Sequence, residues 1–238
     1  MPTYDHVLVT GASRGLGAAI GRELLTRGHR VVLTARSGDQ LAAAAARLQV
    51  DYGNRVQWLA ADLADPVAAQ ALVGTVEQRF GPIDALINNA GTGTLKPLTE
   101  WSADEVIACT QLNLLAPMLL ARAALPGMLL RRCGYIVNIA SDLARRPLAK
   151  MAPYVASKHG LLGFSASLLR EVKGEGVKVT TVLPGIIDTN FNGAREGSKE
   201  ETWALRPDAL AAQVAGLLAL PENVLIDELT VHPLHQEF

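Results

Sequence analysis

The segment Thr10-Gly11-Ala12-Ser13-Arg14-Gly15-Leu16-Gly17 lies between a short apolar run at residues 7–9 and a helical pattern at residues 18–27. Its three glycines allow a tight turn and a close approach of the backbone to a ligand. A loop of this kind at the start of a helix is typical of pyrophosphate binding, because the free amides at a helix N-terminus attract anions. The Gly-x-x-x-Gly-x-Gly spacing therefore predicts a dinucleotide site here.

Short apolar runs alternate with helical patterns along the rest of the chain. Further strands are expected at residues 31–33, 56–60, 85–87, 135–139 and 177–183, with a closing edge strand within 224–231. Helices are expected at residues 39–48, 67–80, 103–125, 154–172 and 207–220. Pro117 either kinks the helix of residues 103–125 or starts a new segment within it.

Apolar strands that are each followed by a helix are typical of a parallel sheet buried on both faces. The predicted fold is therefore α/β: a single-domain doubly wound parallel sheet (Rossmann fold) with helices on both faces. No repeat or linker divides the 238 residues. We expect a cofactor half over about residues 1–100 and a catalytic and substrate half over about residues 101–238.

The composition argues against several function classes. The chain is 49% hydrophobic and 19% charged with a net charge of −1, which gives no electrostatic case for binding nucleic acid or an anionic membrane. Its apolar stretches are interrupted before the roughly 20 residues that a membrane helix needs, and residues 1–6 do not resemble a signal peptide. Cys109 and Cys133 have no neighbouring His or Cys cluster, so we expect packed thiols, no metal site and a cytoplasmic protein.

The end of the second predicted strand bears on which dinucleotide binds. A site that prefers NAD usually carries an acid here for the ribose 2′-hydroxyl, whereas a site that prefers NADP carries a base for the 2′-phosphate. This strand ends in Ala35-Arg36, and Arg14 of the glycine loop is a second base. Arginine suits a phosphate because its fork of donors matches the oxygens; the alternative is two ordinary surface arginines. We expect a preference for NADP(H), with NAD(H) possible, and Asp62 either receives the adenine amino group or serves as an ordinary cap.

Tyr154 and Lys158 lie four residues apart at the start of a predicted helix. This spacing places both side chains on one helix face, where an ammonium favours the phenolate and lowers the pKa of the phenol. Such a tyrosine can exchange a proton with an alcohol oxygen near neutral pH. Ser141 follows the strand expected at residues 135–139, at the same edge of the sheet, where its hydroxyl can donate to a substrate oxygen.

Taken together, these motifs resemble the short-chain dehydrogenase/reductase (SDR) family over nearly the whole chain. The matching pieces, in the family's order and near its spacing, are the loop at residues 10–17, Asp62, Asn88-Asn89-Ala90-Gly91, Asn113, Ser141, Tyr154, Lys158 and Pro184-Gly185 with Thr189. The resemblance implies a catalytic set of Asn113, Ser141, Tyr154 and Lys158. It also implies cofactor contacts from Gly11, Ser13, Arg14, Gly15, Leu16, Gly17, Arg36, Asp62, Leu63, Asn89, Ala90, Gly91, Tyr154, Lys158, Pro184, Gly185, Ile187 and Thr189.

The resemblance further implies a role for each catalytic residue. Tyr154 is expected to act as the general acid in reduction and the general base in oxidation, while Lys158 lowers its pKa and binds the nicotinamide ribose. Ser141 is expected to orient the substrate oxygen, and Asn113 to hold a water that links Lys158 to solvent. The expected activity is that of an NADPH-dependent oxidoreductase acting on the C=O or CH–OH group of a small molecule.

Two other functions fit the same scaffold: a non-catalytic NADP-sensing regulator, and a dehydratase or epimerase that regenerates its cofactor within each cycle. The complete Asn-Ser-Tyr-Lys set favours the oxidoreductase. The helices expected at residues 103–125 and 154–172 carry more apolar side chains than one sheet face covers. An apolar excess of this kind predicts a homo-oligomer, either a dimer or a tetramer.

Overall fold

A parallel sheet forms the centre of the computed structural model, which describes residues 4–200 and 202–236. Within these residues the sheet has seven strands in the order β3-β2-β1-β4-β5-β6-β7. The strands are β1 (His6–Thr10), β2 (Arg30–Ala35), β3 (Val56–Ala60), β4 (Ala85–Asn88), β5 (Gly134–Ile139), β6 (Val177–Pro184) and β7 (Glu228–Val231). Every neighbouring pair is parallel, so all the carboxyl ends lie along one edge.

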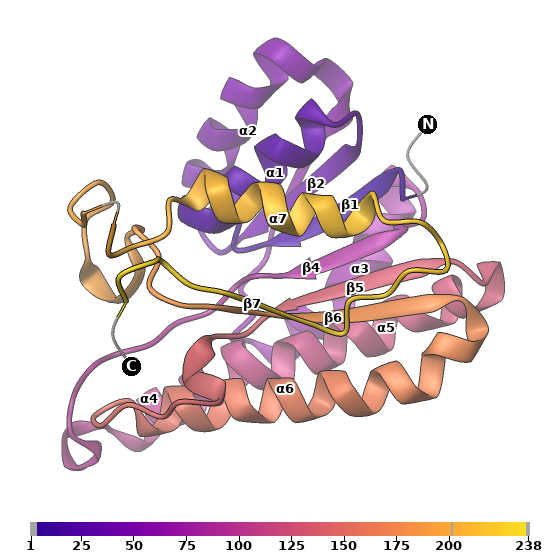
Figure 1. Cartoon of the computed structure of the whole chain (residues 1–238). Coiled ribbons are helices and arrows are strands. Elements are labelled where there is room, and N and C mark those ends of the chain that lie inside the picture. Colours follow the sequence, from indigo (N-terminus) through magenta and orange to yellow (C-terminus); the bar gives the residue numbers. More distant parts are fainter. Residues whose placement is uncertain (1–3, 201, 237–238) are drawn as a thin grey trace.

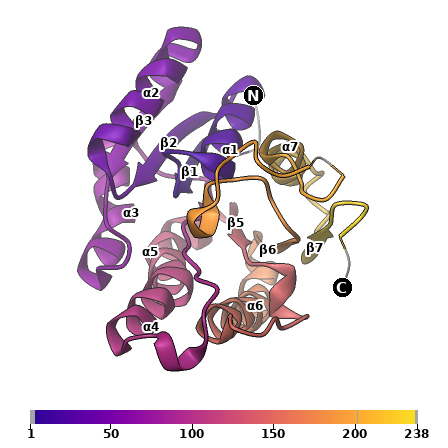
Figure 2. The same ribbon diagram turned by 90° about the vertical axis from the view of Figure 1, so that its left-hand side faces the viewer.

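The strand order reverses between β1 and β4, because the chain first builds outward through β2 and β3 and then returns to the other side of β1. In open parallel sheets this switch opens a crevice at the carboxyl edge, and ligands bind there. Figure 2 looks onto this edge, where the loops that follow the strands converge. The residues of β1, β4, β5 and β6 are all buried, as the unbroken apolar runs predicted.

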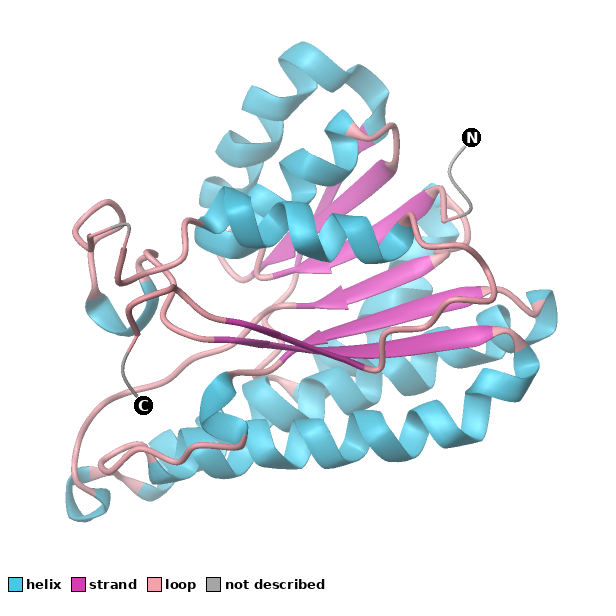
Figure 3. Cartoon of the chain, in the orientation of Figure 1, coloured by secondary structure: helices cyan, strands magenta, loops and turns pink. Residues whose placement is uncertain are grey.

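Helices cover both faces of the sheet (Figures 1 and 3). On one face lie α1 (Gly15–Thr26), α2 (Gly38–Tyr52) and α7 (Pro207–Leu218). On the other lie α3 (Pro66–Phe80), α5 (Ala116–Arg131) and α6 (Ala152–Val172), with α4 (Ala103–Thr110) beside α6. Alternate residues of β1 enter different cores: Val7 and Val9 pack with α1 and α7, whereas Leu8 packs with α3 and α5. The predicted doubly wound fold is confirmed.

The helix expected at residues 103–125 is longer and less regular than predicted. A π-helical turn, Gln111–Leu115, joins α4 to α5, and Pro117 lies in the first turn of α5. Pro117 therefore starts a new segment, which was one of the two predicted alternatives. The helix continues through Pro126 to Arg131 and ends at Arg132, whose φ of 51° is left-handed.

This helical stretch, Ala103–Arg131, has 29 residues and contains a window of mean hydropathy 1.4. By length and composition alone it could cross a membrane, so the expectation that every apolar stretch is too short was wrong. Core helices pass the same test, and 39% of that window is buried inside the molecule. Leu120, Ala124 and Met128 belong to the core beneath the sheet.

Candidate active site

The glycine loop between β1 and α1 is shaped by a lack of space. Gly11 and Gly15 have left-handed φ values of 65° and 55°, which favour glycine. A Cβ at Gly17 would lie 2.3 Å from the carbonyl oxygen of Gly11, and one at Gly11 would lie 2.8 Å from the Cα of Ala90. The first turn of α1 therefore packs directly on the loop that precedes it.

Hydrogen bonds join this loop to the end of β4. The hydroxyl of Thr10 accepts from the backbone amides of Asn89 and Ala90, each at 3.0 Å. The side-chain amide of Asn89 donates to the carbonyl oxygens of Thr10 at 2.9 Å and Gly11 at 3.3 Å. One polar side chain on each of the two strand ends thus holds the switch point of the sheet in place, and Asn89, Ala90 and Gly91 line it as expected.

The predicted contacts for the adenosine end surround the ends of β2 and β3. Ser13 is half-buried, Arg14 and Arg36 are exposed, and neither arginine forms an ion pair with the residues that the structure describes. Asp62 is exposed, and its carboxylate accepts from the amide of Ala64 at 3.1 Å. Leu16 and Leu63 are buried and support the loops from below. Arg14 and Arg36, which form no ion pair with the described residues, could both bind a 2′-phosphate, and Ala35 places no acid nearby to repel it.

Tyr154 and Lys158 lie in the first two turns of α6 and are both buried, 7% and 4% exposed. The ammonium of Lys158 is 5.9 Å from the centroid of the Tyr154 ring and donates to the carbonyl oxygen of Ile139 at 2.7 Å. Ser141 follows β5, and its hydroxyl accepts from the amide of Leu143 at 3.2 Å. The predicted proximity of these three side chains at the carboxyl edge is therefore present in the structure.

The predicted direction of the Tyr154 pKa is wrong. Burial raises the pKa of Tyr154 to about 12; the hydrogen bond with Ser141 opposes this rise, and the charge of Asp142 adds to it. Burial also lowers the pKa of Lys158 to about 8. The four-residue spacing correctly placed the two groups on one helix face. However, the desolvation of the buried phenol raises its pKa more than the ammonium lowers it, because burial also disfavours the charge of Lys158.

Asn113 lies in the π-helical turn and is fully buried. Its side-chain oxygen accepts from the amide of Thr92 at 2.8 Å, and its side-chain nitrogen donates to the carbonyl oxygen of Thr92 at 2.7 Å and to the Ser157 hydroxyl at 3.1 Å. A Cβ at Gly91 would lie 3.2 Å from the Asn113 oxygen and 3.6 Å from the Lys158 ammonium. Asn113 thus positions the chain just after Gly91 against α6.

The segment after β6 closes the other side of the crevice. Gly185 continues the pairing with β7 through its amide, which donates to Val231 at 2.9 Å, and Ile187 forms an isolated parallel bridge with Leu205. Thr189 is buried beside the glycine loop, 3.4 Å from where a Cβ of Gly15 would lie. The segment from Pro184 to Thr189 therefore reaches the glycine loop across the sheet.

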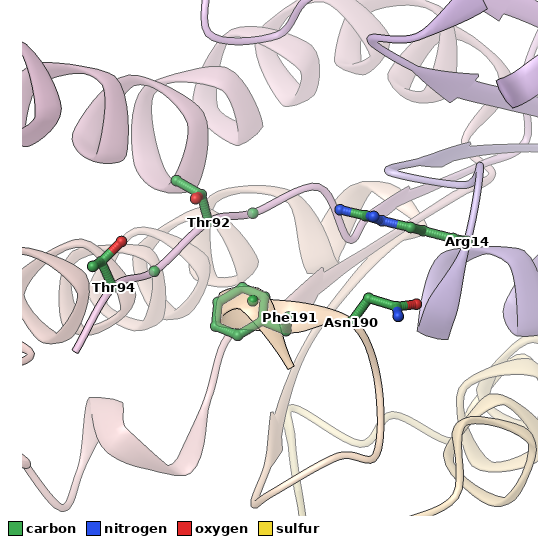
Figure 4. Close-up of a pocket in the computed structure, with 8 residues that line it drawn as sticks. Arg14, Thr92, Thr94, Asn190 and Phe191 are labelled. Atoms are coloured by element: carbon green, nitrogen blue, oxygen red, sulfur yellow. The ribbon is translucent and has the colours of Figure 1, made fainter. Parts of the chain in front are cut away.

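A pocket of about 350 Å³ opens between these segments. Figure 4 shows Arg14 extending from the start of α1 toward Thr92, with Phe191 and Asn190 along the opposite wall. The remaining lining comes from Gly91, Gly93, Thr94 and Gly193. The lining thus comes from the glycine loop, the residues after Gly91 and the segment after Pro184, whereas the loop at residues 142–153 does not line this pocket.

Sequence reasoning missed a polar cluster around Asp142, which is buried beside Ser141. The Asp142 carboxylate is contacted by His232 and Gln236, which follow β7. The acid next to Ser141 was the only signal in the sequence, because its partners lie some ninety residues away in the chain.

Comparison with known proteins agrees with this geometry. The 3-oxoacyl-[acyl-carrier-protein] reductase FabG of Vibrio cholerae is 36% identical, covering 94% of this chain and 93% of that protein. An uncharacterized oxidoreductase of Staphylococcus saprophyticus is 33% identical, covering 95% and 96%. Among solved structures, an alcohol dehydrogenase from Thermococcus sibiricus complexed with 5-hydroxy-NADP superposes with a TM-score of 0.91 at 31% identity, covering 98% of both chains. The family model for short chain dehydrogenases matches residues 5–200, and the chain belongs to this family of oxidoreductases.

Proposed function

We propose that this protein is an NADPH-dependent oxidoreductase that reduces a carbonyl to a secondary alcohol, or runs the reverse reaction. One observation carries the proposal: Tyr154, Ser141 and Lys158 meet at the carboxyl edge of the sheet, beside the glycine loop of β1 and α1. A phenol whose pKa is raised to about 12 is protonated at neutral pH, as a general acid must be before it gives its proton to a substrate oxygen.

Each residue of the set then has a defined task. Tyr154 delivers the proton, and the Ser141 hydroxyl donates to the same substrate oxygen, where charge develops. NADPH, when bound, would supply the hydride, and Lys158 would hold its nicotinamide ribose. The side chain of Asn113 is committed to Thr92, so the backbone carbonyl of its π-helical turn is the group we assign to holding the relay water.

The cofactor preference rests on Arg14, Arg36 and Ala35. Both arginines are exposed near the ends of β1 and β2, and Ala35 offers no carboxylate to a ribose 2′-hydroxyl. Similar proteins of known structure include a metagenomic short-chain oxidoreductase in complex with NADP, at 37% identity with a TM-score of 0.84, and a serine dehydrogenase complexed with NADP+. The pyrophosphate of the same cofactor would bind at the amides of the first turn of α1, which Gly11 and Gly17 allow to pack closely on the preceding loop.

A screen of NADPH oxidation tests the activity. The panel contains a 3-oxoacyl thioester, β-ketoesters, ketones, aldehydes, quinones and pterins, and it starts with the thioester because of the likeness to 3-oxoacyl-[acyl-carrier-protein] reductases. We expect net consumption of NADPH with at least one of them and none with the Tyr154→Phe variant. Binding of NADPH without turnover of any carbonyl would favour the regulator, and product formation without net NADPH consumption would favour the dehydratase or epimerase.

We further propose a cytoplasmic homo-oligomer. Cys109 and Cys133 are free thiols, which suits a reducing compartment. Part of the apolar excess on the long helices is covered within the chain, since Leu120, Leu161 and Leu168 are buried. Half-buried or exposed apolar side chains remain on these helices at Ile107, Leu112, Leu115, Met118, Leu119, Phe164 and Leu169. Light scattering at micromolar concentration is expected to give a multiple of 25.3 kDa; the monomer mass would contradict the proposal.

A further inference from the structure

The chain beyond β7 returns to the carboxyl edge of the sheet, where the loops after β5 and β6 meet. In Figures 1 and 3 this last segment passes beside those loops, far from the opposite edge of the sheet, where β1 begins. The backbone pairing of β6 with β7 extends one step further, through the Gly185 amide and the Val231 carbonyl. Residues 232–236 are thereby placed beside Gly185 and Ser141.

Gln236 contacts both loops with one side chain. Its side-chain oxygen accepts from the backbone amide of Ile186 at 2.8 Å, and its side-chain nitrogen donates to a carboxylate oxygen of Asp142, also at 2.8 Å. A Cβ at Gly185 would lie 2.1 Å from the Gln236 oxygen and 2.9 Å from the His232 ring. Gly185 therefore provides the space in which the Gln236 amide lies.

Asp142 transmits this contact to Ser141. The Asp142 side chain is buried, and a buried carboxylate needs donors to offset its lost hydration. One of its oxygens receives Gln236 and lies 3.5 Å from a ring nitrogen of His232, while the other accepts from the Ser141 hydroxyl at 3.2 Å. Because both oxygens are engaged, the carboxylate holds the Ser141 oxygen in place, and rotation of the hydroxyl then turns its single hydrogen from Asp142 to a substrate oxygen.

We propose that Gln236 is a positioning residue of the active site, which joins Asp142 and Ser141 on the loop after β5 to Ile186 on the loop after β6. The segment that follows β7 is thus part of the catalytic architecture, although it touches none of the reacting atoms. The inference rests on the proposed function of Ser141 and of the segment at residues 184–189. Its consequence is that a change in Gln236 disturbs the substrate oxygen and the nicotinamide end together.

A charge-swap cycle tests the proposal. Gln236→Glu places a second carboxylate against Asp142 and removes the donor, so we expect kcat to fall by roughly 10- to 100-fold. Asp142→Asn keeps an acceptor for Gln236 and a polar partner for Ser141, so a smaller loss is expected. In the double variant the new amide at position 142 donates to the new carboxylate at position 236, and we expect most of the Gln236→Glu loss to be recovered. Leu234→Ala, at a side chain that is 90% exposed, is the matched control.

A second readout needs no turnover. Exchange of the Ile186 amide in the free protein, followed by mass spectrometry on a peptide that covers residues 184–189, is expected to accelerate in Gln236→Glu and to return in the double variant. If Gln236→Glu proves unstable by thermal unfolding, Gln236→Asn replaces it, because the shorter amide carries no charge and cannot span both partners. Losses that simply add in the double variant, or a Gln236→Glu protein that matches Leu234→Ala in kcat and exchange, would overturn the proposal. If the variants show this pattern of exchange but the wild-type protein reduces no carbonyl, the proposed function is refuted instead.

Discussion

The loop between β1 and α1 and the first turns of α6 solve different physical problems at the same edge of the sheet. The loop is built from backbone, and its limits are steric: a single added Cβ at Gly17 meets a carbonyl oxygen at 2.3 Å. The start of α6 is built from buried ionisable side chains, and its limits are electrostatic: burial raises the pKa of Tyr154 and lowers that of Lys158. The shape of the first region requires glycine because no larger residue fits. In the second region, burial disfavours the charged forms of the Tyr154 and Lys158 side chains.

This contrast predicts opposite responses to substitution. Adding atoms to the glycine loop is expected to damage folding and cofactor binding together. Removing charge or a hydroxyl from α6 is expected to damage chemistry while leaving the fold intact or more stable. Stability and function are thus expected to change in the same direction in the first region and in opposite directions in the second.

The largest expected effect is that of Tyr154→Phe on kcat. The change removes one buried hydroxyl and little volume, so the loss is that of a positioned general acid, about 10²- to 10⁴-fold. NADPH affinity, measured by nicotinamide fluorescence, and Tm are expected to stay close to the wild-type values. A variant that retains more than about a tenth of the wild-type rate would assign the proton transfer to another group.

Gly17→Ala is the steric counterpart. The new methyl group would overlap the Gly11 carbonyl and, at 2.5 Å, the Asn89 amide, so the loop has to move. We expect NADPH affinity to fall by roughly 10²-fold and Tm to drop by several degrees. Gly74→Ala is the control, since a Cβ there has no neighbour within 4 Å and alanine is the better helix former in α3. If Gly17→Ala and Gly74→Ala had the same NADPH affinity and Tm, the steric account of the glycine loop would be contradicted.

A third test addresses charge inside the cofactor region. Ala35→Asp together with Arg36→Leu supplies an acid for the ribose 2′-hydroxyl and removes a base for the 2′-phosphate, so the kcat/KM ratio of NADPH to NADH is expected to fall about tenfold or more. Arg47→Leu, which removes an exposed arginine from α2, is expected to leave the ratio unchanged. An unmodified protein that uses NADH as well as NADPH would contradict the assignment of Arg14 and Arg36.

The smallest expected effect is a gain in stability from Lys158→Met. Burial lowers the pKa of Lys158 from 10.5 to about 8, so between these values the unfolded chain binds more protons and wild-type stability rises with pH. Below pH 8 the folded protein carries the full cost of a buried ammonium, which methionine lacks. The Tm of the variant is expected to exceed that of the wild type by a few degrees at pH 6–7, with the excess shrinking toward pH 10.5. An excess that does not change with pH would show that packing, not charge, causes it.

The sequence predicted the fold well because each strand and helix carries its own pattern. β3 begins and ends where the strand expected at residues 56–60 does, and α3 ends at Phe80, the last residue of the helix expected at residues 67–80. The π-helical turn at Gln111–Leu115 could not be predicted, because its wide spacing depends on the bonds from Asn113 to Thr92 and Ser157. Those bonds exist only once β4 and α6 are assembled.

The candidate site shows the same division. The glycine spacing and the Tyr154–Lys158 spacing are local, and the sequence placed both correctly. The pKa of Tyr154 depends on enclosure by Phe191, Cys109 and other residues that are distant in the chain, so helical spacing alone gave the wrong direction. The contacts of Gln236 could not be predicted for a related reason: its two partners, Ile186 and Asp142, are separated from it by long stretches of chain.

The π-helical turn also shows how a buried polar side chain such as Asn113 can be placed at the sheet edge without a change of fold. A turn of this kind holds one residue more than an α-helical turn, so it is equivalent to a single insertion absorbed within an existing helix. Deleting Leu112 would let α4 and α5 join as one regular helix, with Leu120 and Met128 still able to occupy the core. Asn113 would then rotate by about 100° relative to one of its flanking helices and lose Thr92. At this position a one-codon change separates a purely structural helix from one that carries a candidate active-site residue.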